Sequence, residues 1–206
     1  MLSRPVIGVM GGICSGKSLV SSIFGEFGFV VIDADKIVSE LYNDRQFVER
    51  QLVPVFGEKV ADENKQVNRE FLSDVVFDDK EKLGRLNSIV HPVVLDRIKE
   101  LLSVYRDSDH VRGVILDVPL LLETGLDKDC DVLLFVETDE ALRRQRAMKR
   151  SGISQKELEK RQKSQIFLDK KKNIANYTVY NNTETSVLRV QVADVISDIN
   201  HKFSGE

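Results

Sequence analysis

The stretch Gly11–Ser18, with the sequence GGICSGKS, constrains the fold more than any other part of the chain. It fits the pattern G-x-x-x-x-G-K-[ST] of a phosphate-binding loop, in which glycines let the backbone approach an anion closely. The apolar run Pro5–Met10 before it has the length of a buried strand, and apolar residues follow at helical spacing from Leu19 to Phe27. Because strand, glycine loop and helix are the context that the motif requires, a chance glycine turn is the weaker interpretation.

The motif also predicts what the loop binds. Its backbone N–H groups point inward at the start of a helix, where the helix dipole favours an anion. Lys17 is expected to reach the β- and γ-phosphates of a nucleotide, and the hydroxyl of Ser18 is expected to ligate Mg²⁺. We therefore expect ATP and Mg²⁺ as cofactors. The expected nucleotide-binding residues of the loop are Gly11, Gly12, Ile13, Cys14, Ser15, Gly16, Lys17 and Ser18.

Length and composition exclude several classes of protein. A chain of 206 residues suits one large domain, or a core domain with an insertion. No apolar run approaches the ~18–20 residues that cross a membrane. A cleavable signal peptide would consume the phosphate loop, and two cysteines, Cys14 and Cys130, give neither a disulfide framework nor a zinc pattern. We expect a cytoplasmic protein, monomeric or weakly homo-oligomeric, with no membrane partner.

Charge is distributed unevenly along the chain. The net charge of −3 argues against a basic nucleic-acid binder. Residues 143–172, however, hold 12 of the 30 basic residues and three of the 33 acidic ones, so this segment carries +9. Such runs are usually solvated helix surface, but beside a phosphate loop this one favours a helical lid that closes over phosphates. Arg143, Arg146 and Arg150 share one helix face, and arginine forks suit phosphate oxygens.

The rest of the chain completes a parallel sheet flanked by helices. Further strands are expected over residues 29–33, 111–117, 131–136 and 175–182, and an amphipathic helix over 188–199. Together with the phosphate loop, this pattern predicts an α/β fold like that of the P-loop nucleoside-triphosphate hydrolases.

Acidic residues end two of the expected strands. Asp33 is the last residue of the second expected strand and Asp35 lies just after it, and ligands of open α/β sheets bind at the carboxyl ends of strands. We prefer Asp35 as the group that handles an attacking hydroxyl, while Asp33 remains open for that role, because an acid at a helix start is also a common N-cap. Asp117 ends the third strand and is expected to act near Mg²⁺ through water, unless it is another cap.

Between the second and third strands lies a long, mainly helical segment. Residues 36–106 are far longer than an ordinary crossover, so we expect an inserted helical subdomain that grips the acceptor substrate. Within it, His91–Pro92 is expected to separate two helices, because the residue before a proline disfavours the helical conformation. The core is then expected to comprise residues 1–35, 107–142 and 173–206 of one domain, with the lid over 143–172.

In this order, the motifs resemble the dephospho-coenzyme A kinase family over almost the whole chain. Beside the glycine loop, the resemblance rests on several motifs, namely Ile32–Asp35 (IDAD), Asn68–Arg69, Val76–Phe77, Leu86–Pro92 (LNSIVHP), Asp117–Glu123 (DVPLLLE), Arg146–Arg150, Gln165 and Asn181. The glycine loop alone is shared by many nucleotide enzymes, whereas the Asp-Ala-Asp, His-Pro and Pro-Leu-Leu-x-Glu elements are much more specific.

The resemblance implies transfer of the ATP γ-phosphoryl group to the ribose 3′-hydroxyl of dephospho-CoA. It implies that catalysis rests on the base and on three cations, namely Asp35, Lys17, Arg146 and Arg150. It places several residues beside the acceptor, namely Asp33, Arg69, His91, Pro119, Leu120 and Glu123. Leu19 and Asn181 join the nucleotide site. On the residues alone, His91 could equally be structural, and Arg69 could simply pair with a neighbouring acid.

This sequence departs from the family pattern at four positions. Cys14 stands where the family usually has glycine, and Leu19 where it usually has threonine. Asn176 replaces an acid and Thr183 a glycine, which we interpret as structural drift. The cysteine adds a side chain to a tight loop, so it bears on nucleotide affinity.

Three other functions fit the glycine loop. A different small-molecule or nucleoside-monophosphate kinase would share the core, but the Pro119–Glu123 element argues against it. A nucleotide-switch GTPase would carry an Asn-Lys-x-Asp motif, and Asn64–Val67 lacks the acid. A scaffold with decayed catalysis is disfavoured because Lys17, Ser18, Asp35 and Asp117 are all present.

Overall fold

A computed structural model describes residues 4–77, 79–151 and 168–203 of the chain. The chain forms two compact units, one of Met1–Ile32 with Leu102–Glu206 and one of Asp33–Leu101. Each unit is described by itself below.

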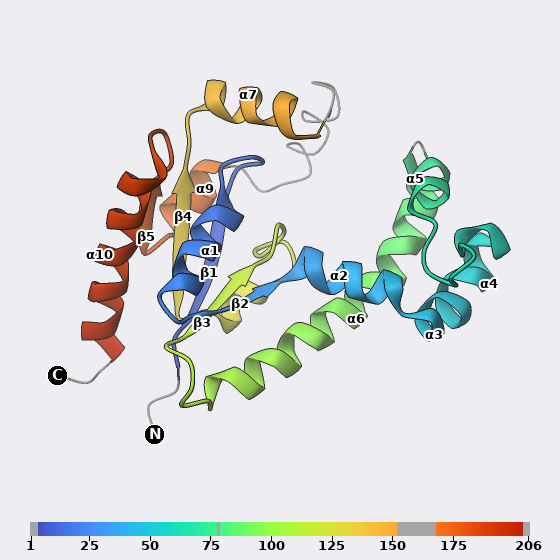
Figure 1. Ribbon diagram of the computed structural model, residues 1–206, viewed down its shortest axis with the longest axis horizontal. Coiled ribbons are helices and arrows are strands. Elements are labelled where there is room, and N and C mark those ends of the chain that lie inside the picture. Colours follow the sequence, from blue (N-terminus) through green and yellow to red (C-terminus); the bar gives the residue numbers. More distant parts are fainter. Residues whose placement is uncertain (1–3, 78, 152–167, 204–206) are drawn as a thin grey trace. The chain divides into compact units, whose positions relative to one another are not determined.

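The first unit is built on a five-stranded parallel sheet (Figure 1). Its strands are β1 (Val6–Gly11), β2 (Val30–Asp33), β3 (Val114–Asp117), β4 (Val132–Glu137) and β5 (Tyr177–Tyr180), in the order β2-β3-β1-β4-β5. In register, Ile7 of β1 lies between Ile115 of β3 and Val132 of β4. The expected α/β fold and its strands are thus confirmed, with β1 at the centre, so the segment that follows β1 emerges in the middle of the sheet edge.

Two helices cover one face of this sheet, α1 (Lys17–Glu26) and α10 (Thr185–Phe203). Ile7 and Val9 of β1 enter the same buried cluster as apolar residues of these helices. Phe24 of α1 is fully buried and meets Phe29 edge to face, with ring centroids 5.2 Å apart. This apolar burial fixes the direction of α1 and therefore of its N-terminus.

The opposite face of β1 packs against the segment between β3 and β4. Side chains alternate along a strand, so Gly8 faces away from Ile7 and Val9. A Cβ on Gly8 would lie 2.6 Å from Leu121 Cδ2 and 2.7 Å from Cys130 Sγ, so only glycine permits this close packing. The same segment contains the short 3₁₀ helix η3 (Leu126–Asp129). Helix α9 (Leu168–Asn173) also contacts β1.

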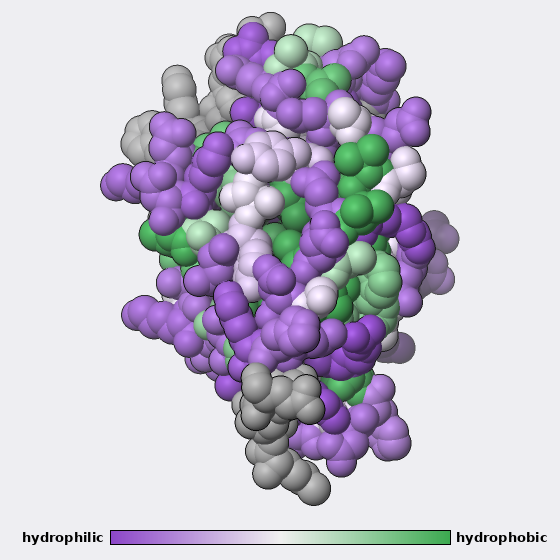
Figure 2. All heavy atoms as spheres, turned by 90° about the vertical axis from the view of Figure 1, so that its left-hand side faces the viewer, coloured by the Kyte–Doolittle hydropathy of each residue, from purple (hydrophilic) through white to green (hydrophobic). Residues whose placement is uncertain are grey.

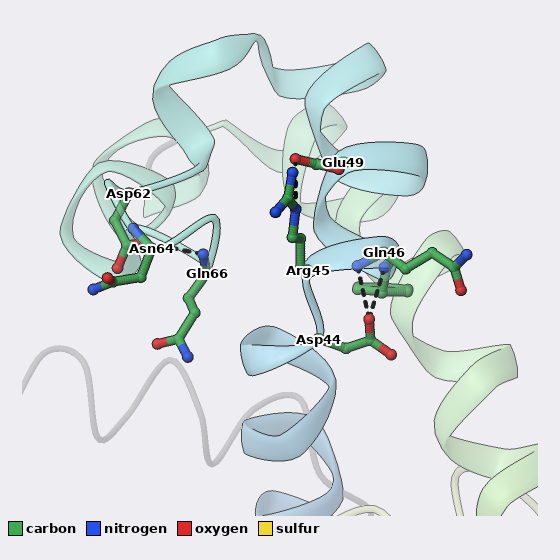
Figure 3. Close-up of polar contacts among 8 residues, drawn as sticks. Asp44, Arg45, Gln46, Glu49, Asp62, Asn64 and Gln66 are labelled. Atoms are coloured by element: carbon green, nitrogen blue, oxygen red, sulfur yellow. Dashed lines mark hydrogen bonds and ion pairs between the residues drawn. The ribbon is translucent and has the colours of Figure 1, made fainter.

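The second unit is helical. It contains α2 (Ala34–Asn43), α3 (Arg45–Phe47), the π-helix η1 (Val48–Leu52), α4 (Val53–Phe56), the 3₁₀ helix η2 (Glu58–Val60), α5 (Arg69–Phe77) and most of α6 (Lys80–Arg106). Its polar turns are closed by aspartates that accept backbone N–H groups (Figure 3). Asp44 Oδ1 accepts from Gln46 N at 2.8 Å, and Asp62 Oδ1 accepts from Asn64 N at 2.8 Å and from Gln66 N at 2.9 Å. These turns order the connections from α2 to α3 and from η2 to α5.

Helix α6 contradicts the expected break at His91–Pro92. It runs without interruption from Lys80 to Arg106 with Pro92 inside it. A proline removes one helical hydrogen bond, which here would be accepted by the carbonyl of Ser88. His91, Pro92 and Val93 are all exposed, so water can solvate that carbonyl. Val90, Val94 and Ile98 are buried and hold the two halves of the helix in one direction.

The face shown in Figure 2 is mainly hydrophilic, with small separate apolar areas. Within the described ranges, no helix combines the length and the apolar character needed to cross a membrane.

Candidate active site

The phosphate loop joins the buried strand β1 to helix α1. Gly16 caps α1 in the left-handed conformation, with φ 93°, which glycine adopts without a steric penalty. Cys14 also has a positive φ, of 58°, which is uncommon for a residue with a side chain. The loop has a left-handed backbone at position 14. Cysteine at this position, in place of the glycine that the family usually has, therefore adds backbone strain.

The middle of the loop is a tight turn made by Ile13 and Cys14. The backbone N–H of Ser15 donates to the carbonyl of Gly12 at 3.2 Å and closes this turn. Ile13 is half-buried and its side chain is apolar, so the side chain has no group that could bind phosphate. Ile13, expected to bind nucleotide, can therefore do so only through its backbone N–H, and this role stays a prediction.

Lys17 folds back over the loop. Its Nζ atom donates to the carbonyl of Gly11 at 3.3 Å and to that of Gly12 at 3.1 Å. The ammonium group is thereby held against the loop that the motif assigns to phosphate. Ser18 is exposed at the start of α1, so its hydroxyl is accessible to a metal ion. Leu19 is also exposed in this first turn of the helix.

The loop is anchored through the carbonyl of Ser15. Thr138 Oγ1 donates to this oxygen at 2.9 Å and Asn181 Nδ2 at 2.8 Å. Both donors are buried and directly follow the carboxyl ends of β4 and β5. Asn181, expected to bind nucleotide, thus supports the loop that would bind it. Thr138 was not expected from the sequence, although its place just after an apolar strand is a usable signal.

Two arginines of α7 (Glu140–Ser151) lie beside the loop. Arg146 Nη2 donates to the carbonyl of Asn181 at 3.0 Å, and Arg143 Nε donates to the carbonyl of Thr138 at 3.1 Å. Arg143 is only 8% exposed. The sequence placed Arg143 on the shared face of arginines suited to phosphate oxygens, but the resemblance gave it no catalytic or binding role. Of the expected lid, residues 152–167, including Gln165, and the side chain of Arg150 lie outside the part that the structure describes.

Three buried polar atoms around the loop lack hydrogen-bond partners among the described residues, namely Ser15 Oγ, Arg143 Nη1 and Arg146 Nη1. A buried polar group without a partner costs roughly 1–3 kcal/mol, and a charged group costs more. All three atoms lie beside the phosphate loop, and two of them belong to positively charged guanidinium groups. The donor set therefore fits a polyanion such as a nucleotide phosphate chain.

Asp117 ends β3, the strand paired with β1. It is 6% exposed, so its carboxylate is buried. Across the described residues, no cluster of three or more metal-ligating side chains forms. Mg²⁺ in kinases commonly takes one or two protein ligands together with substrate phosphates and water, so Ser18 and Asp117 suffice in number.

The two acids after β2 have different environments. Asp33 caps α2, because its Oδ1 accepts from the backbone N–H groups of Asp35 at 2.8 Å and Lys36 at 3.1 Å. Asp35 is exposed in the first turn of that helix. The cap of α2 thus uses one carboxylate oxygen of Asp33. The sequence left open whether Asp33 caps the helix or handles the attacking hydroxyl.

Two expected acceptor-side residues lie in the second unit. Arg69 Nη2 donates to Ser39 Oγ at 2.8 Å, and its guanidinium lies 5.7 Å from the ring centroid of Tyr42. Burial raises the pKa of Tyr42, and the positive charge of Arg69 opposes this rise. Arg69 is exposed and pairs with a hydroxyl rather than an acid. His91 is exposed on α6 and is not part of the buried core.

The remaining expected residues follow β3. Pro119 and Leu120 lie half-buried in a turn, in which Thr124 Oγ1 donates to the carbonyl of Leu120 at 2.8 Å. Glu123 Oε1 forms an ion pair at 3.1 Å with Lys171 Nζ of α9. The two side chains are 18% and 3% exposed, so the lysine is buried while the glutamate keeps some contact with solvent.

A comparison with known protein families decides between the interpretations of the phosphate loop. The family model for dephospho-CoA kinase matches residues 5–186. The chain belongs to the dephospho-CoA kinase family. It is therefore a kinase of coenzyme A biosynthesis, and the nucleotide-switch and scaffold interpretations fall away.

Individual relatives agree with this assignment. A dephospho-CoA kinase of Fusobacterium nucleatum is 40% identical over 182 residues, covering 88% of this chain and 92% of the relative. One of Staphylococcus aureus is 39% identical over 176 residues, covering 85% and 84%. A crystal structure of a Thermus thermophilus protein superposes with a TM-score of 0.76 at 30% identity, covering 95% and 98%. The dephospho-CoA kinase of Campylobacter jejuni has the same fold, with a TM-score of 0.70 at 23% identity over 95% and 97% of the two chains.

We predict that nucleotide protects Cys14 of this family member from alkylation. Iodoacetamide at pH 8 should modify Cys14 more slowly with ATP present, because bound phosphates cover the loop. Burial, reinforced by Asp129, Asp127 and Asp131, raises the pKa of Cys130 to about 12, so that thiol stays protonated and unreactive. Mass spectrometry of the modified peptides gives the two rates. Equal rates at Cys14 with and without ATP would dispose of this prediction.

We also predict that Lys171→Met destabilises the protein by about 3 kcal/mol, because the change removes the buried cation of this ion pair. The measurement is the free energy of unfolding in urea. Lys170→Met, at an exposed position on the same helix, is the matched control and should leave stability unchanged. Similar values for the two variants would show that the ion pair contributes nothing specific.

Proposed function

We propose that the chain transfers the γ-phosphoryl group of ATP to the 3′-hydroxyl of the ribose of dephospho-CoA, giving CoA and ADP. The observation that carries the donor half is the set of buried, unpartnered polar atoms around the phosphate loop, namely Ser15 Oγ, Arg143 Nη1 and Arg146 Nη1 among the described residues. The acceptor half rests on membership of the dephospho-CoA kinase family.

On the donor side, the N–H groups of the loop, that of Ile13 included, and Lys17 hold the phosphates. Arg146 and Arg150 neutralise charge on the migrating group, because phosphoryl transfer is mainly positioning and electrostatic stabilisation. Leu19 and Asn181 complete the nucleotide site, with Asn181 acting through the carbonyl of Ser15.

The proposed Mg²⁺ site lies where the phosphate loop meets the start of α1. Ser18 directly, and Asp117 through water, would hold Mg²⁺, which would supply positive charge to neutralise the phosphates. The exposed hydroxyl of Ser18 and the buried carboxylate of Asp117 at the end of β3 support this assignment.

On the acceptor side, Asp35 accepts the proton of the attacking hydroxyl. This choice is supported by the division between the two acids, since Asp33 uses a carboxylate oxygen to cap α2. Arg69 and His91 of the helical insertion contact the acceptor. Pro119, Leu120 and Glu123, which follow β3, also bind the acceptor, with Lys171 fixing Glu123.

The regions of the chain divide accordingly. Residues 36–106 form the acceptor-binding insertion and 143–172 form the lid, within one kinase domain. The protein works in the cytoplasm on small molecules, as a monomer or a weak homo-oligomer.

An acceptor panel tests this function. ADP release is measured with ATP and Mg²⁺ in the presence of dephospho-CoA, AMP, adenosine or water alone. We expect turnover with dephospho-CoA only, and none when Mg²⁺ is removed by a chelator. Equal ADP release with and without dephospho-CoA would contradict acceptor-dependent transfer, and preference for AMP would indicate a nucleoside-monophosphate kinase.

A further inference from the structure

Arg143 is a buried cation to which the proposed mechanism assigns no task. It lies on α7 and is 8% exposed. Its neighbour Arg144 is exposed and forms an ordinary surface pair with Glu140 at 2.6 Å. The two arginines are adjacent in sequence but face different environments, so burial of Arg143 follows from its place on the helix face beside the loop.

The guanidinium of Arg143 is fixed against Gly12. Its Nε donates to the carbonyl of Thr138 at 3.1 Å, which sets the orientation of the fork. A Cβ on Gly12 would lie 2.6 Å from Nη1, 3.2 Å from Cζ and 3.3 Å from Cδ of Arg143. The fork therefore occupies the space that any side chain at position 12 would need.

Nothing within the described ranges balances this charge. Arg143 forms no ion pair there, and its buried Nη1 has no hydrogen-bond partner. Taking an arginine out of water without an anion is costly, and folded proteins compensate such charges by pairing them. Lys17 Nζ donates to the carbonyl of the same Gly12 at 3.1 Å. Two cations thus bracket one glycine of the phosphate loop.

We propose that Arg143 is a second phosphate-binding cation of the loop, which donates through Nη1 to the β- or γ-phosphate of the donor nucleotide. Lys17 serves that end of the phosphate chain in loops of this type, and Arg143 meets the same glycine. An anion placed there neutralises both cations and satisfies Nη1. The inference deepens the proposed function and rests on its donor half.

The assignment makes Gly12 a partner of Arg143. Gly11 and Gly16 of this loop have a positive φ, but Gly12 does not. The backbone conformation at Gly12 therefore does not itself exclude a side chain. Gly12→Ala should therefore act mainly by displacing the guanidinium, which is the flexible end of a side chain. Loss of the arginine and loss of the glycine then remove the same contact.

Nucleotide affinities of the full-length protein test the proposal. Dissociation constants for ATP, ADP and AMP are measured by calorimetry for the wild type, Arg143→Met, Arg143→Lys and the control Arg144→Met. We expect Arg143→Met to weaken ATP and ADP binding about 10- to 100-fold while AMP binding changes less than about twofold, because AMP lacks the phosphates concerned. Arg143→Lys should lie between, and Arg144→Met should match the wild type.

The double variant Gly12→Ala/Arg143→Met adds a second readout. We expect ATP affinity no lower than that of the weaker single variant, whereas independent sites would give additive losses. Equal weakening of ATP and AMP by Arg143→Met, or additive losses in the double variant, would overturn the proposal in favour of a structural role. If Arg143→Met does not fold, an unchanged ratio of ATP to AMP affinity in Arg143→Lys overturns it. If the wild type binds ATP and Arg143→Met binds it with the same affinity, only this inference is refuted. If the wild type does not bind ATP, the proposed function is refuted as well.

Discussion

Lys17→Ala should lower turnover by about a thousandfold or more and weaken ATP binding. The ammonium group lies over the loop through its contacts with Gly11 and Gly12, so it is already held at the loop that the proposal assigns to the phosphates. Removing one preorganised donor from a phosphoryl or acyl transfer site costs roughly 10²–10³ in rate, and here a full charge is removed as well. The measurements are kcat for ADP release and the dissociation constant for ATP.

The control for this variant is Lys128→Ala, at an exposed position in the segment between β3 and β4. It should keep wild-type turnover and ATP affinity. Both variants should unfold at the same temperature as the wild type, because Lys17 is only partly buried. A Lys17→Ala enzyme with near-normal kcat would show that the loop does not serve the transferred phosphate.

The second large effect is expected for Asp35→Asn. This change should lower kcat by about 10²–10⁴ while ATP affinity stays within a few-fold, because the proposed role of Asp35 is to accept the proton of the acceptor hydroxyl. The measurement separates kcat with saturating dephospho-CoA from ATP binding without it. A variant that loses ATP binding yet turns over normally once saturated would mean that the residue is misassigned.

Asp33→Asn is the matched control, and it resolves the choice between the two acids. Asparagine caps helices about as well as aspartate, so the start of α2 should persist and stability should be kept. If Asp33 only caps, turnover is retained. If Asp33 is the base, Asp33→Asn is the inactive variant and Asp35→Asn is the active one, which would reverse the assignment.

Local pattern was enough to predict the framework of the fold. β1, the glycine loop and α1 are contiguous in sequence, so apolar run, glycine spacing and helical periodicity report on them directly. The strands β3 and β4 could also be predicted from local apolar runs. Asp33 and Asp35 could be found together, because both follow a strand, but which of them caps the helix depends on backbone geometry that the sequence leaves open.

The parts that the sequence did not predict depend on distant partners. The carbonyl of Ser15 is held by Thr138 and Asn181, from segments more than 120 residues away. Each residue follows a strand, but that local position does not show that the two side chains meet at this carbonyl. Burial of Arg143 against Gly12 follows from the direction of α7, whereas arginine is usually a surface residue.

The expected helix break at Pro92 was wrong for a related reason. Val90, Val94 and Ile98 pack into the protein on both sides of the proline, and this burial outweighs the local cost of one lost helical hydrogen bond. The local rule for the residue before a proline carries no information on such packing.

The most direct test of the account is the position of the transferred phosphate. The full-length protein is incubated with ATP labelled in the γ-phosphate, Mg²⁺ and dephospho-CoA, and the product is analysed by mass spectrometry and ³¹P NMR. The account predicts one labelled phosphate on the ribose 3′-oxygen, formed together with an equal amount of ADP. Label in free phosphate only, or on any other oxygen of the acceptor, would contradict it.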